Sequence, residues 1–534
     1  MLFKVSRAMG AIHRILAGNR QWVLFAALLV ALVAQRCLVL DRFAFRYTDH
    51  DQVLMWYAAT EYAHLRVHEP RFYGQNYNTM LEAAFAAPLV LAGVPHAQAL
   101  PIVTSFLALS PFVLLGIFAL RRGLPLTGIA SLALPLTLPL RFHLVTSMPR
   151  GFVTGGFVAC LAALVGLRSS RLAGAFLFGL LAAASISVLP NALVLVIPLG
   201  VYVGLEKRNR PAWLAAAALG AGAAGLLHAV VQYFYVTHPA ASFLSGDQAG
   251  VLASLLGGDA VTRVSSGLSS PGRFLSDVLP TLLGGPVGAA VAILGPPLLL
   301  WRARRYAVAL ASLVGGLSLV VALGLPKVQV GSDSIFYPWS RHFLPLPIAL
   351  LLYLLWWEMG RRQTTRQRVR TGLAVALALC AAGVVATDWR SVDGIVPLEL
   401  AVPQRHVIPA RTDAVYRNCR LLEIDVRMTH ASIVVFPLSS NLPLNYACPA
   451  VLEEPFSTLC PEYDRRAWLF ETELARRPRQ LLLYDYDWSV AERAMKRFTD
   501  VKFMRTRPSV LLVGADDQSL AEVLRGLRIK VRAH

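Results

Sequence analysis

The sequence predicts a polytopic α-helical membrane protein that ends in a soluble α/β domain. Of its 534 residues, 56% are hydrophobic and only 15% are charged, and the mean hydropathy is +0.54. Apolar runs long enough to cross a bilayer core of about 30 Å recur up to about residue 390. From Asp388 onward polar and charged residues become common. We therefore expect a membrane domain in residues 1–387 and a C-terminal domain in residues 388–534.

The apolar runs predict about 11 transmembrane helices. Each run ends in charged residues, Pro or Gly, the usual signals that end a helix. The first run begins near Trp22 and lacks the small residues of a cleavage site, which indicates an uncleaved span. Residues 79–93 are apolar but short, and fit either a twelfth span or an interfacial helix. The predicted spans are residues 22–40, 99–120, 124–140, 152–167, 172–189, 191–205, 212–233, 279–300, 306–324, 343–358 and 371–387.

The basic residues predict the orientation. The net charge is +20, and basic clusters such as Arg302 to Arg305 and Arg361 to Arg370 lie between alternate spans, as the positive-inside rule requires. A cytoplasmic N-terminus then puts everything after residue 388 outside, together with loops 41–98, 141–151, 190–191, 234–278 and 325–342. A twelfth span at 79–93 would break this alternation. Because no basic stripe is interleaved with stacking aromatic residues, we expect no nucleic-acid partner.

The C-terminal domain is predicted to be a small α/β fold. Strand-like runs at 431–438, 480–488 and 509–514 alternate with helical patterns at 464–477, 488–499 and 517–527. If this domain is exported, Cys448 and Cys460 are expected to close a short loop, which leaves an odd thiol. The acids of YDYDW, residues 484–488, are expected to cap a strand end rather than bind sugar or calcium.

Two aspartates, Asp49 and Asp51, flank His50 directly after the first span. In an extended chain, side chains two residues apart point to the same side at about 7 Å. The pair could share a divalent cation, or one carboxylate could act as a base while the other orients it. A structural interpretation is compatible with this: Thr48 and Asp51 fit a capping box for the next helix, with Asp49 as a first-turn acid. The sequence leaves a metal requirement unknown.

The rest of the first outer loop is dense in aromatic and hydrogen-bonding residues. Rings stack on the C–H faces of sugars, and amides and carboxylates bind hydroxyls. An interfacial aromatic belt would explain the tyrosines but not the amides and Glu82. His64 and His68, four residues apart, are expected to be ordinary surface or packing residues rather than a metal pair. The candidate substrate-binding residues of this loop are Tyr73, Gln75, Tyr77 and Glu82.

A second group of candidate residues, Arg341 and His342, stands where the tenth span begins on the outer side. A guanidinium at that depth suits a phosphate at the headgroup level. Snorkelling, or anchoring of the span, explains the arginine equally well. The second outer loop, RFHLVTSMPRGF, is basic through Arg141, His143 and Arg150 and fits a further phosphate contact.

The acidic pair, the stretches FYGQNY and LEA, and SRHFLPLP before a late span resemble the GT-C superfamily of glycosyltransferases over residues 20–360. They are similar to the branch that contains protein O-mannosyltransferases and lipid A aminoarabinose transferases. The resemblance implies a polyprenyl-phosphate-linked sugar donor, an extracytoplasmic acceptor hydroxyl on a glycan, lipid or protein, and inversion at the sugar. It implies the bacterial inner membrane as the location, with the C-terminal domain in the periplasm.

The resemblance also implies roles for three residues. Asp49 matches the general base, Asp51 matches a supporting residue or cation ligand, and Arg341 matches the phosphate-binding arginine. Members often carry another acid in the second outer loop, which is absent here, so the choice of Asp49 over Asp51 as the base stays open.

A transporter or flippase of lipid-linked sugars, or a non-catalytic membrane scaffold, is the alternative. A transporter would show paired broken helices or internal symmetry. Neither is evident in the sequence, and the candidate ionisable residues gather in predicted outer loops rather than within spans.

Overall fold

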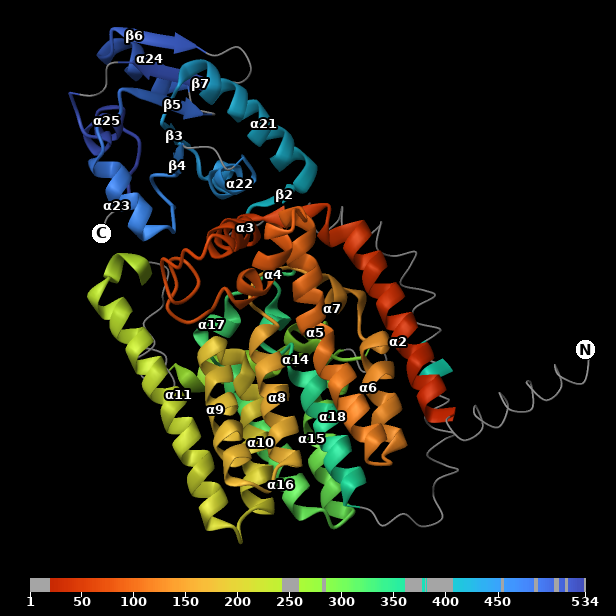
Figure 1. Ribbon diagram of the computed structural model, residues 1–534. Helices are drawn as coiled ribbons and strands as arrows, with labels where there is room; N and C mark the ends of the chain where they lie inside the picture. The colour runs from red at the N-terminus through yellow and green to blue at the C-terminus, as the bar shows by residue number, and fades with distance from the viewer. Residues whose placement is uncertain are drawn as a thin grey trace, which may run out of the picture.

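A bundle of apolar helices carries a smaller, sheet-containing region at one end (Figure 1). The computed structural model describes residues 20–242, 259–280, 285–360, 377–379, 381, 407–452, 456–484, 488–503, 509–513 and 517–532. Helices α2 and α11 run along opposite edges of the bundle. Its main helices are α2 (Arg20–Val39), α5 (His96–Arg121), α6 (Pro125–Thr137), α8 (Thr154–Arg168), α9 (Leu172–Val188), α10 (Leu193–Glu206), α11 (Pro211–Thr237), α15 (Gly285–Arg302), α16 (Tyr306–Leu323) and α18 (Leu346–Met359).

Each of the first ten predicted spans corresponds to one of these helices. Four described helical stretches are both long and apolar enough to cross a membrane, and the other apolar helices have 10–17 residues. The eleventh predicted span, residues 371–387, lies almost entirely outside the described residues, so the count of about 11 stays a prediction. The four long stretches are Arg20–Ala44, His96–Arg121, Pro211–Thr237 and Tyr306–Leu323.

Small residues let neighbouring helices of the bundle approach closely. A Cβ atom at Gly179 of α9 would lie 1.8 Å from the carbonyl oxygen of Ala217 in α11. One at Gly220 of α11 would lie 2.0 Å from the carbonyl oxygen of Phe176. Helices α9 and α11 therefore pack backbone to backbone, which is a common arrangement in membrane proteins.

Buried polar side chains connect helices inside the bundle. Glu358, near the end of α18, accepts hydrogen bonds from the backbone N–H of Thr127 at 2.9 Å and from its hydroxyl at 2.7 Å, so it satisfies the first turn of α6. Arg36 of α2 donates to the carbonyl oxygen of His143 at 2.9 Å and to the hydroxyl of Thr146 at 3.1 Å. These contacts of Arg36 hold α7 (Leu140–Val145) against α2.

The predicted outer loops meet at the end of the bundle that faces the sheet. Asn191 donates to the carbonyl oxygen of Phe152 at 3.0 Å, and Ser340 donates to Asp277 at 2.6 Å. Segment 79–93 contributes α4 (Leu81–Leu91), which at 11 residues is about 16 Å long and too short to cross a bilayer by itself. The other short elements at this end are η1 (Leu40–Ala44), α3 (His50–Ala63), η2 (Pro190–Ala192), η3 (Pro239–Ser242), α13 (Ala260–Ser269), α14 (Pro271–Leu275), α17 (Pro326–Gln329) and η5 (Trp339–His342).

The C-terminal region is built on a five-stranded sheet with the order β4-β3-β5-β7-β6. Strand β3 is parallel to β4 and β5, while β7 is antiparallel to β5 and β6. The three predicted strands are confirmed as β3, β5 and β7, and the three predicted helices as α23, α24 and α25. The elements are α21 (Thr412–Thr429), β3 (Ile433–Val435), η6 (Ser439–Asn441), α22 (Leu442–Leu452), β4 (Ser457–Leu459), α23 (Ala467–Ala475), β5 (Gln480–Tyr484), α24 (Trp488–Arg497), β6 (Asp500–Phe503), β7 (Ser509–Val513) and α25 (Leu520–Gly526).

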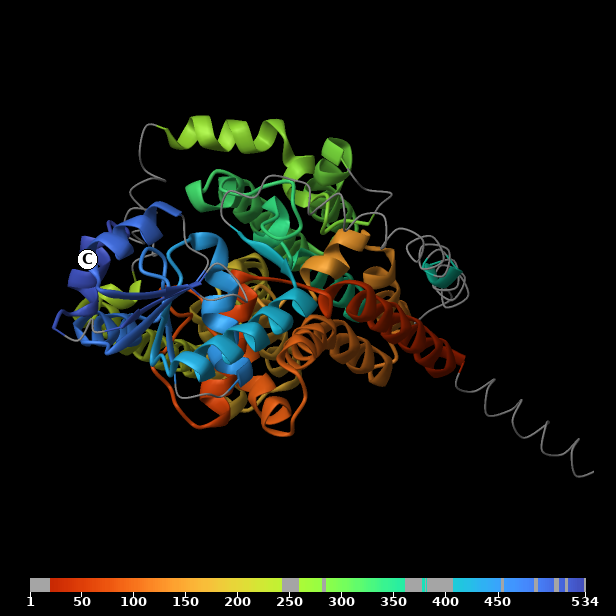
Figure 2. The same ribbon diagram turned by 90° about the horizontal axis from the view of Figure 1, so that it is seen from above.

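The two faces of this sheet belong to different cores, because alternate strand residues point to opposite faces. Ile433 and Val435 pack with α24 and α25. Val434 lies in a core that includes α21 and α22 and continues into α3 and α5 of the helical bundle. Seen from above, the C-terminal region covers only part of the bundle end and lies away from the N-terminal end of α2 (Figure 2).

A strand pair also joins the two regions. Strand β1 (Tyr47–Asp49) pairs antiparallel with β2 (Pro409–Arg411), so that Thr48 lies opposite Ala410. Next to this pair, the backbone N–H and hydroxyl of Thr412 donate to the carbonyl oxygens of Arg46 and Phe45. The start of α3 is thus tied to a segment about 360 residues later in the chain.

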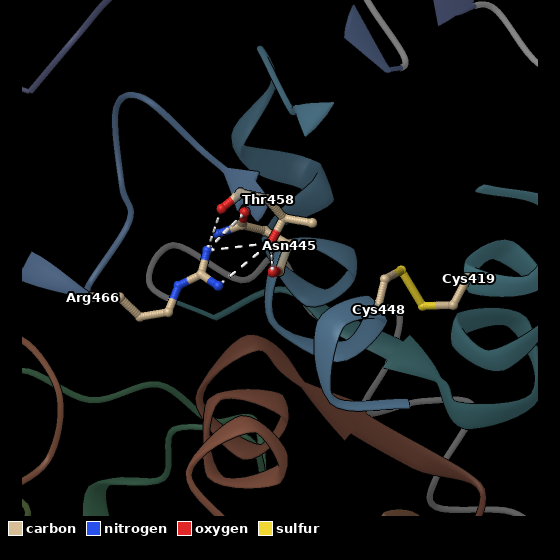
Figure 3. Close-up of a disulfide and its surroundings, with 5 residues drawn as sticks. All are labelled: Cys419, Asn445, Cys448, Thr458 and Arg466. Carbon is tan, nitrogen blue, oxygen red and sulfur yellow. Dashed lines mark hydrogen bonds between the residues drawn. A yellow bond between two sulfur atoms is a disulfide. The ribbon is translucent and has the colours of Figure 1, made fainter. Parts of the chain in front are cut away.

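The disulfide joins Cys419 of α21 to Cys448 of α22, with their Cα atoms 4.9 Å apart (Figure 3). The predicted Cys448–Cys460 pair is therefore wrong. Proximity in the sequence suggested it, but α21 and α22 pack side by side and bring Cys419 to Cys448 instead. Cys460 directly follows β4 and is a buried free thiol.

Candidate active site

Asp49 caps helix α3. Its Oδ1 atom accepts hydrogen bonds from the backbone N–H groups of Asp51 at 2.9 Å and Gln52 at 3.0 Å, and its Oδ2 atom accepts from the Gln52 side chain at 2.6 Å. The predicted capping box on Thr48 is wrong, because the extended β1 backbone continues through Asp49 and the helix begins at His50. Asp49 is the helix cap, and its side chain is fully buried.

Asp51 lies in the first turn of the same helix, between two arginines. Arg150, from the loop between α7 and α8, donates to its Oδ2 atom, and Arg465, from the C-terminal region, donates to its Oδ1 atom. The Asp51 side chain is 13% exposed. The two aspartates are linked through Arg150, whose Nη1 atom lies 3.8 Å from Asp49 Oδ2. Residues far apart in the sequence thus meet at one carboxylate.

The surroundings move the pKa values of these groups in different directions. Burial raises the pKa of Asp49, against the opposing charge of Arg150. Burial also opposes ionisation of Asp51, but the charges of Arg465 and Arg150 outweigh it and hold the Asp51 pKa well below its usual range. Burial lowers the pKa of His50 to about 4, so this imidazole is neutral near pH 7. Asp51 is therefore a stable anion in this cluster.

The first outer loop positions the backbone that carries Arg150. Asn78 donates to the carbonyl oxygen of Arg150 at 3.0 Å, and Glu82 accepts from the backbone N–H of Gly151 at 2.8 Å. Gly151 has φ of +78°, and a Cβ atom there would lie 2.5 Å from Asn78 Oδ1. Burial raises the pKa of Glu82 to about 8. Glu82 therefore contacts the backbone next to Arg150. The predicted role of Glu82 in binding substrate stays a prediction.

Arg341 lies in η5, at the same end of the bundle. Its guanidinium donates to the carbonyl oxygens of Pro338 at 2.9 Å and Lys327 at 3.0 Å. It lies 4.1 Å from the centre of the Tyr337 ring, and the Arg150 guanidinium lies 5.7 Å from the same ring. Arg150 and Arg341 thus share Tyr337. This ring connects the acidic pair to the predicted phosphate-binding arginine.

Lys327 and Tyr77 complete this side of the site. The ammonium group of Lys327 lies 2.9 Å from the centre of the Tyr77 ring. Burial, with the charge of Arg341, lowers the pKa of Lys327 to about 7. Among the described residues, no ion pair joins Lys327 or Arg341 to a carboxylate. Arg341 is buried and Lys327 is half-buried, and two such cations without a carboxylate partner among the residues that the structure describes make a suitable site for a phosphate group.

The remaining predicted substrate residues are His342, Tyr73 and Gln75. The predicted ligand His342 follows Arg341 directly, and burial lowers its pKa well below the ordinary value. Tyr73 is fully buried against Trp468 of the C-terminal region, with ring centres 4.6 Å apart. Gln75 donates its backbone N–H to Phe72 at 2.8 Å in the same loop. Their predicted contacts with substrate stay predictions.

The donor atoms of the acidic pair do not fit a divalent cation. Both oxygens of Asp49 accept hydrogen bonds, and both oxygens of Asp51 face guanidinium groups, so positive charge is already supplied by the protein. Among the described residues there is no cluster of three or more His, Cys, Asp or Glu side chains that could hold a metal. His68 stacks on Trp468 and pairs with Glu61, in agreement with its expected structural role.

An apolar pocket opens beside the cations. It is small, with a cavity volume of about 20 Å³, and it lies between α5, α7, α8 and the start of α18. Phe152, which lines it, has its ring 5.3 Å from the Arg150 guanidinium. Leu344 and Pro345, which also line it, directly follow the turn that carries Arg341. A hydrophobic space therefore adjoins the site of excess positive charge.

Three residues of this cluster were not recognised in the sequence as site residues. Lys327 and Tyr337 lie in the expected outer loop 325–342 but belong to no motif. Arg465 lies in PEYDRRAW, and nothing there indicates a contact with residues 414 positions earlier. Arg150 was noted as a basic residue of the second loop, and only the structure shows that it contacts Asp51.

The bundle of apolar helices and the sheet-containing region at its end define the fold of this chain. Among solved structures, the same fold is found in ArnT, a lipid A aminoarabinose transferase, from Cupriavidus metallidurans bound to undecaprenyl phosphate. The TM-score is 0.53 at 12% sequence identity, over 92% of this chain and 98% of that chain. This likeness confirms, for the fold, the predicted resemblance to the GT-C superfamily. No family model matches the sequence, and no curated protein matches it.

Proposed function

We propose that the chain is an integral membrane glycosyltransferase that moves a sugar from a polyprenyl-phosphate donor to an extracytoplasmic acceptor hydroxyl, with inversion. The observation that carries this proposal is one cluster in which Asp51 and two uncompensated cations, Arg341 and Lys327, are linked through Arg150 and Tyr337. The shared fold with a transferase bound to undecaprenyl phosphate supports the same class of donor.

The donor phosphate is assigned to the space beside Arg341 and Lys327. The donor phosphate is a diester with one negative charge, and it becomes a monoester with two negative charges as the sugar leaves. The guanidinium and ammonium groups offset this developing charge. The small apolar pocket lined by Phe152 and Leu344 marks the hydrophobic side of the site, and we assign the isoprene chain of the donor to this side. This placement puts the bond that breaks near Asp51.

Asp51 is assigned as the carboxylate that activates the acceptor, rather than Asp49. Asp49 is fully buried, and both of its oxygens hold the helix start, whereas the Asp51 side chain is partly exposed. Asp51 takes the proton of the acceptor hydroxyl, the oxygen bonds to the anomeric carbon, and the bond to the donor phosphate breaks. A phosphate that enters beside Arg150 competes for its guanidinium, and this raises the basicity of Asp51 at the moment of reaction.

Disulfide Cys419–Cys448 supports an extracytoplasmic C-terminal region, because disulfides persist in oxidising compartments. Strand pair β1–β2 and the Asp51–Arg465 contact support a site on that same side of the membrane. With the basic clusters on the opposite side, the N-terminus is cytoplasmic, and the membrane is the bacterial inner membrane.

The test uses purified protein in detergent with undecaprenyl-phosphate-linked hexoses and pentoses, and acceptor fractions from membranes. We expect acceptor-dependent release of undecaprenyl phosphate, and loss of that release in Arg341→Gln. Retention of intact donor in every mixture would contradict the transferase. Movement of intact donor across liposomes that contain the protein would identify a flippase instead.

A further inference from the structure

The turn between β4 and α23 is held rigidly by its own charges. Asp464 accepts hydrogen bonds from the backbone N–H of Arg466 and from its Nε atom, both at 3.0 Å. The Arg466 guanidinium also donates to the carbonyl oxygen of Thr458 at 2.7 Å and to the side chain of Asn445 at 3.1 Å (Figure 3). Both charged side chains are fully buried. The pair neutralises itself and fixes the turn.

Arg465, the residue between them, points out of the turn. Its backbone N–H donates to the hydroxyl of Tyr446 at 3.1 Å, which fixes the start of its side chain. One end of its guanidinium donates to Asp51, and the other lies 3.3 Å from Nε2 of His50. The backbone N–H of Ile408 donates to the other ring nitrogen of His50 at 3.1 Å. The C-terminal region thus contacts the first turn of α3 from two sides.

We propose that Arg465 is a positioning residue of the transferase, by which the C-terminal region completes the reaction centre and holds Asp51 as an oriented anion. This inference rests on the proposed function. It gives the C-terminal region a direct part in the chemistry, in addition to any contact with the acceptor.

The contacts distinguish this role from phosphate binding. Arg465 pairs with Asp51, and its second nitrogen faces His50. Arg341 contacts backbone carbonyls and the Tyr337 ring, and among the described residues it forms no ion pair with a carboxylate, so its charge is available for an anion. Asp51 is faced by Asp49, His50, Tyr77, Arg150 and Arg465. Arg150 contacts Asp51 and shares the Tyr337 ring with Arg341. In the described part of the chain, loss of Arg465 would leave Arg150 as the single cation in contact with Asp51.

The experiment compares Arg465→Gln and Arg465→Lys with wild-type protein. Arg427→Ala is the control, because Arg427 forms an exposed i,i+4 pair with Glu423 in the same region. Transfer is measured from pH 4.5 to 9 with an undecaprenyl-phosphate sugar that wild-type protein uses. Binding of undecaprenyl phosphate is measured separately.

Arg465→Gln should lower kcat about 10- to 100-fold, the effect of losing a charged hydrogen bond. The fall of kcat on the acidic side should begin at least one pH unit higher, because the Asp51 pKa rises. The affinity for undecaprenyl phosphate should change less than threefold, and Arg465→Lys should recover most of the rate. An unchanged pH profile, or a loss confined to undecaprenyl phosphate affinity, would overturn the positioning role.

A double-mutant cycle keeps the inference separate from the proposed function. Asp51→Asn, Arg465→Gln and the double variant are compared by thermal unfolding, which needs no substrate. Coupling predicts that Arg465→Gln lowers the unfolding midpoint less when Asp51 is already Asn. Additive effects would overturn the contact even if transfer is observed. Absence of transfer by wild-type protein would instead contradict the proposed function and leave the coupling result to stand.

Discussion

At the scale of single residues, Asp49 and Asp51 differ because a helix begins between them. The carboxylate of Asp49 satisfies the N–H groups of the first turn of α3. The carboxylate of Asp51 points away from these groups to two guanidinium groups. A D-x-D pair that looks symmetric in the sequence thus contains one structural and one accessible carboxylate.

Replacement of the two aspartates should separate these roles. Asp51→Asn should lower kcat about 10²- to 10⁴-fold, the usual contribution of a general base. Asp49→Asn should retain far more activity, because Asn caps a helix about as well as Asp. Transfer assays on both variants, with thermal unfolding as the control for folding, check this. Equal losses in the two variants would assign the base to the pair rather than to Asp51, and wild-type rates in both would refute an acidic centre.

Lys327 should make donor binding depend on pH. Its pKa is lowered to about 7, so in the free protein it loses its charge as the pH rises through 7. A bound phosphate stabilises the charged form, so binding above pH 7 requires proton uptake and the affinity should fall with rising pH. The charge of Arg341, the ring of Tyr77 and the imidazole of His342 are the other groups that face it.

Isothermal titration with undecaprenyl phosphate between pH 6 and 9 measures this effect. Lys327→Arg is the matched reference, because an arginine stays charged over this whole pH range. The phosphate ligand also titrates, but it does so equally with both proteins, so a difference between them reports on Lys327. The affinity of wild-type protein should fall relative to Lys327→Arg above pH 7. Parallel pH curves for the two proteins would exclude Lys327 from the phosphate site.

At the scale of elements, the loop between α7 and α8 carries Arg150 to the acidic pair, and its shape depends on Gly151. Gly151→Ala introduces a left-handed alanine, which costs about 1–2 kcal/mol. It also places a methyl group 2.5 Å from Asn78 Oδ1. Arg150 should move, and transfer should fall at least tenfold. Gly93→Ala is the control: its φ is +84°, but nothing lies within 4 Å of the added methyl group. Similar activity in the two variants would argue that the backbone contacts at Gly151 do not position Arg150.

The sequence predicted helices far better than contacts between elements. Hydropathy locates α5 or α16 because each helix is apolar along its length. It could not indicate β1 or β2, which are three residues each and form only because the other is present. The same limit explains the wrong cap at Thr48, since pairing with Ala410 keeps the chain extended past that residue. It also explains the wrong disulfide, because helix packing rather than sequence distance selects Cys419.

At the scale of the whole molecule, the site is shared between the bundle and the C-terminal region. Alternation of basic clusters predicted which loops lie on the same side, and this is enough to gather Asp51, Arg150 and Arg341 at one end. It cannot predict which of the several cations there contact an acid. Arg465 is the extreme case, because its contact depends on the docking of a whole folded region.

Disulfide Cys419–Cys448 should stabilise the C-terminal region in an oxidising compartment. Replacement of both cysteines by Ala should lower its stability by about 2–4 kcal/mol, the usual effect of one native disulfide. Thermal unfolding measures this loss, with Cys37→Ala, an exposed free thiol, as the control. Thiol labelling of denatured protein taken from intact cells should find Cys419 and Cys448 protected. Full labelling of both would contradict the pair and the extracytoplasmic location.

A structure with undecaprenyl phosphate bound, determined by cryo-electron microscopy in a lipid nanodisc, tests the central claim most directly. The account predicts phosphate oxygens about 3 Å from the nitrogen atoms of Arg341 and Lys327, on the side of Arg150 that faces Tyr337, with Asp51 in the same cavity. A phosphate bound away from these cations, or separated from Asp51 by packed protein, would contradict it.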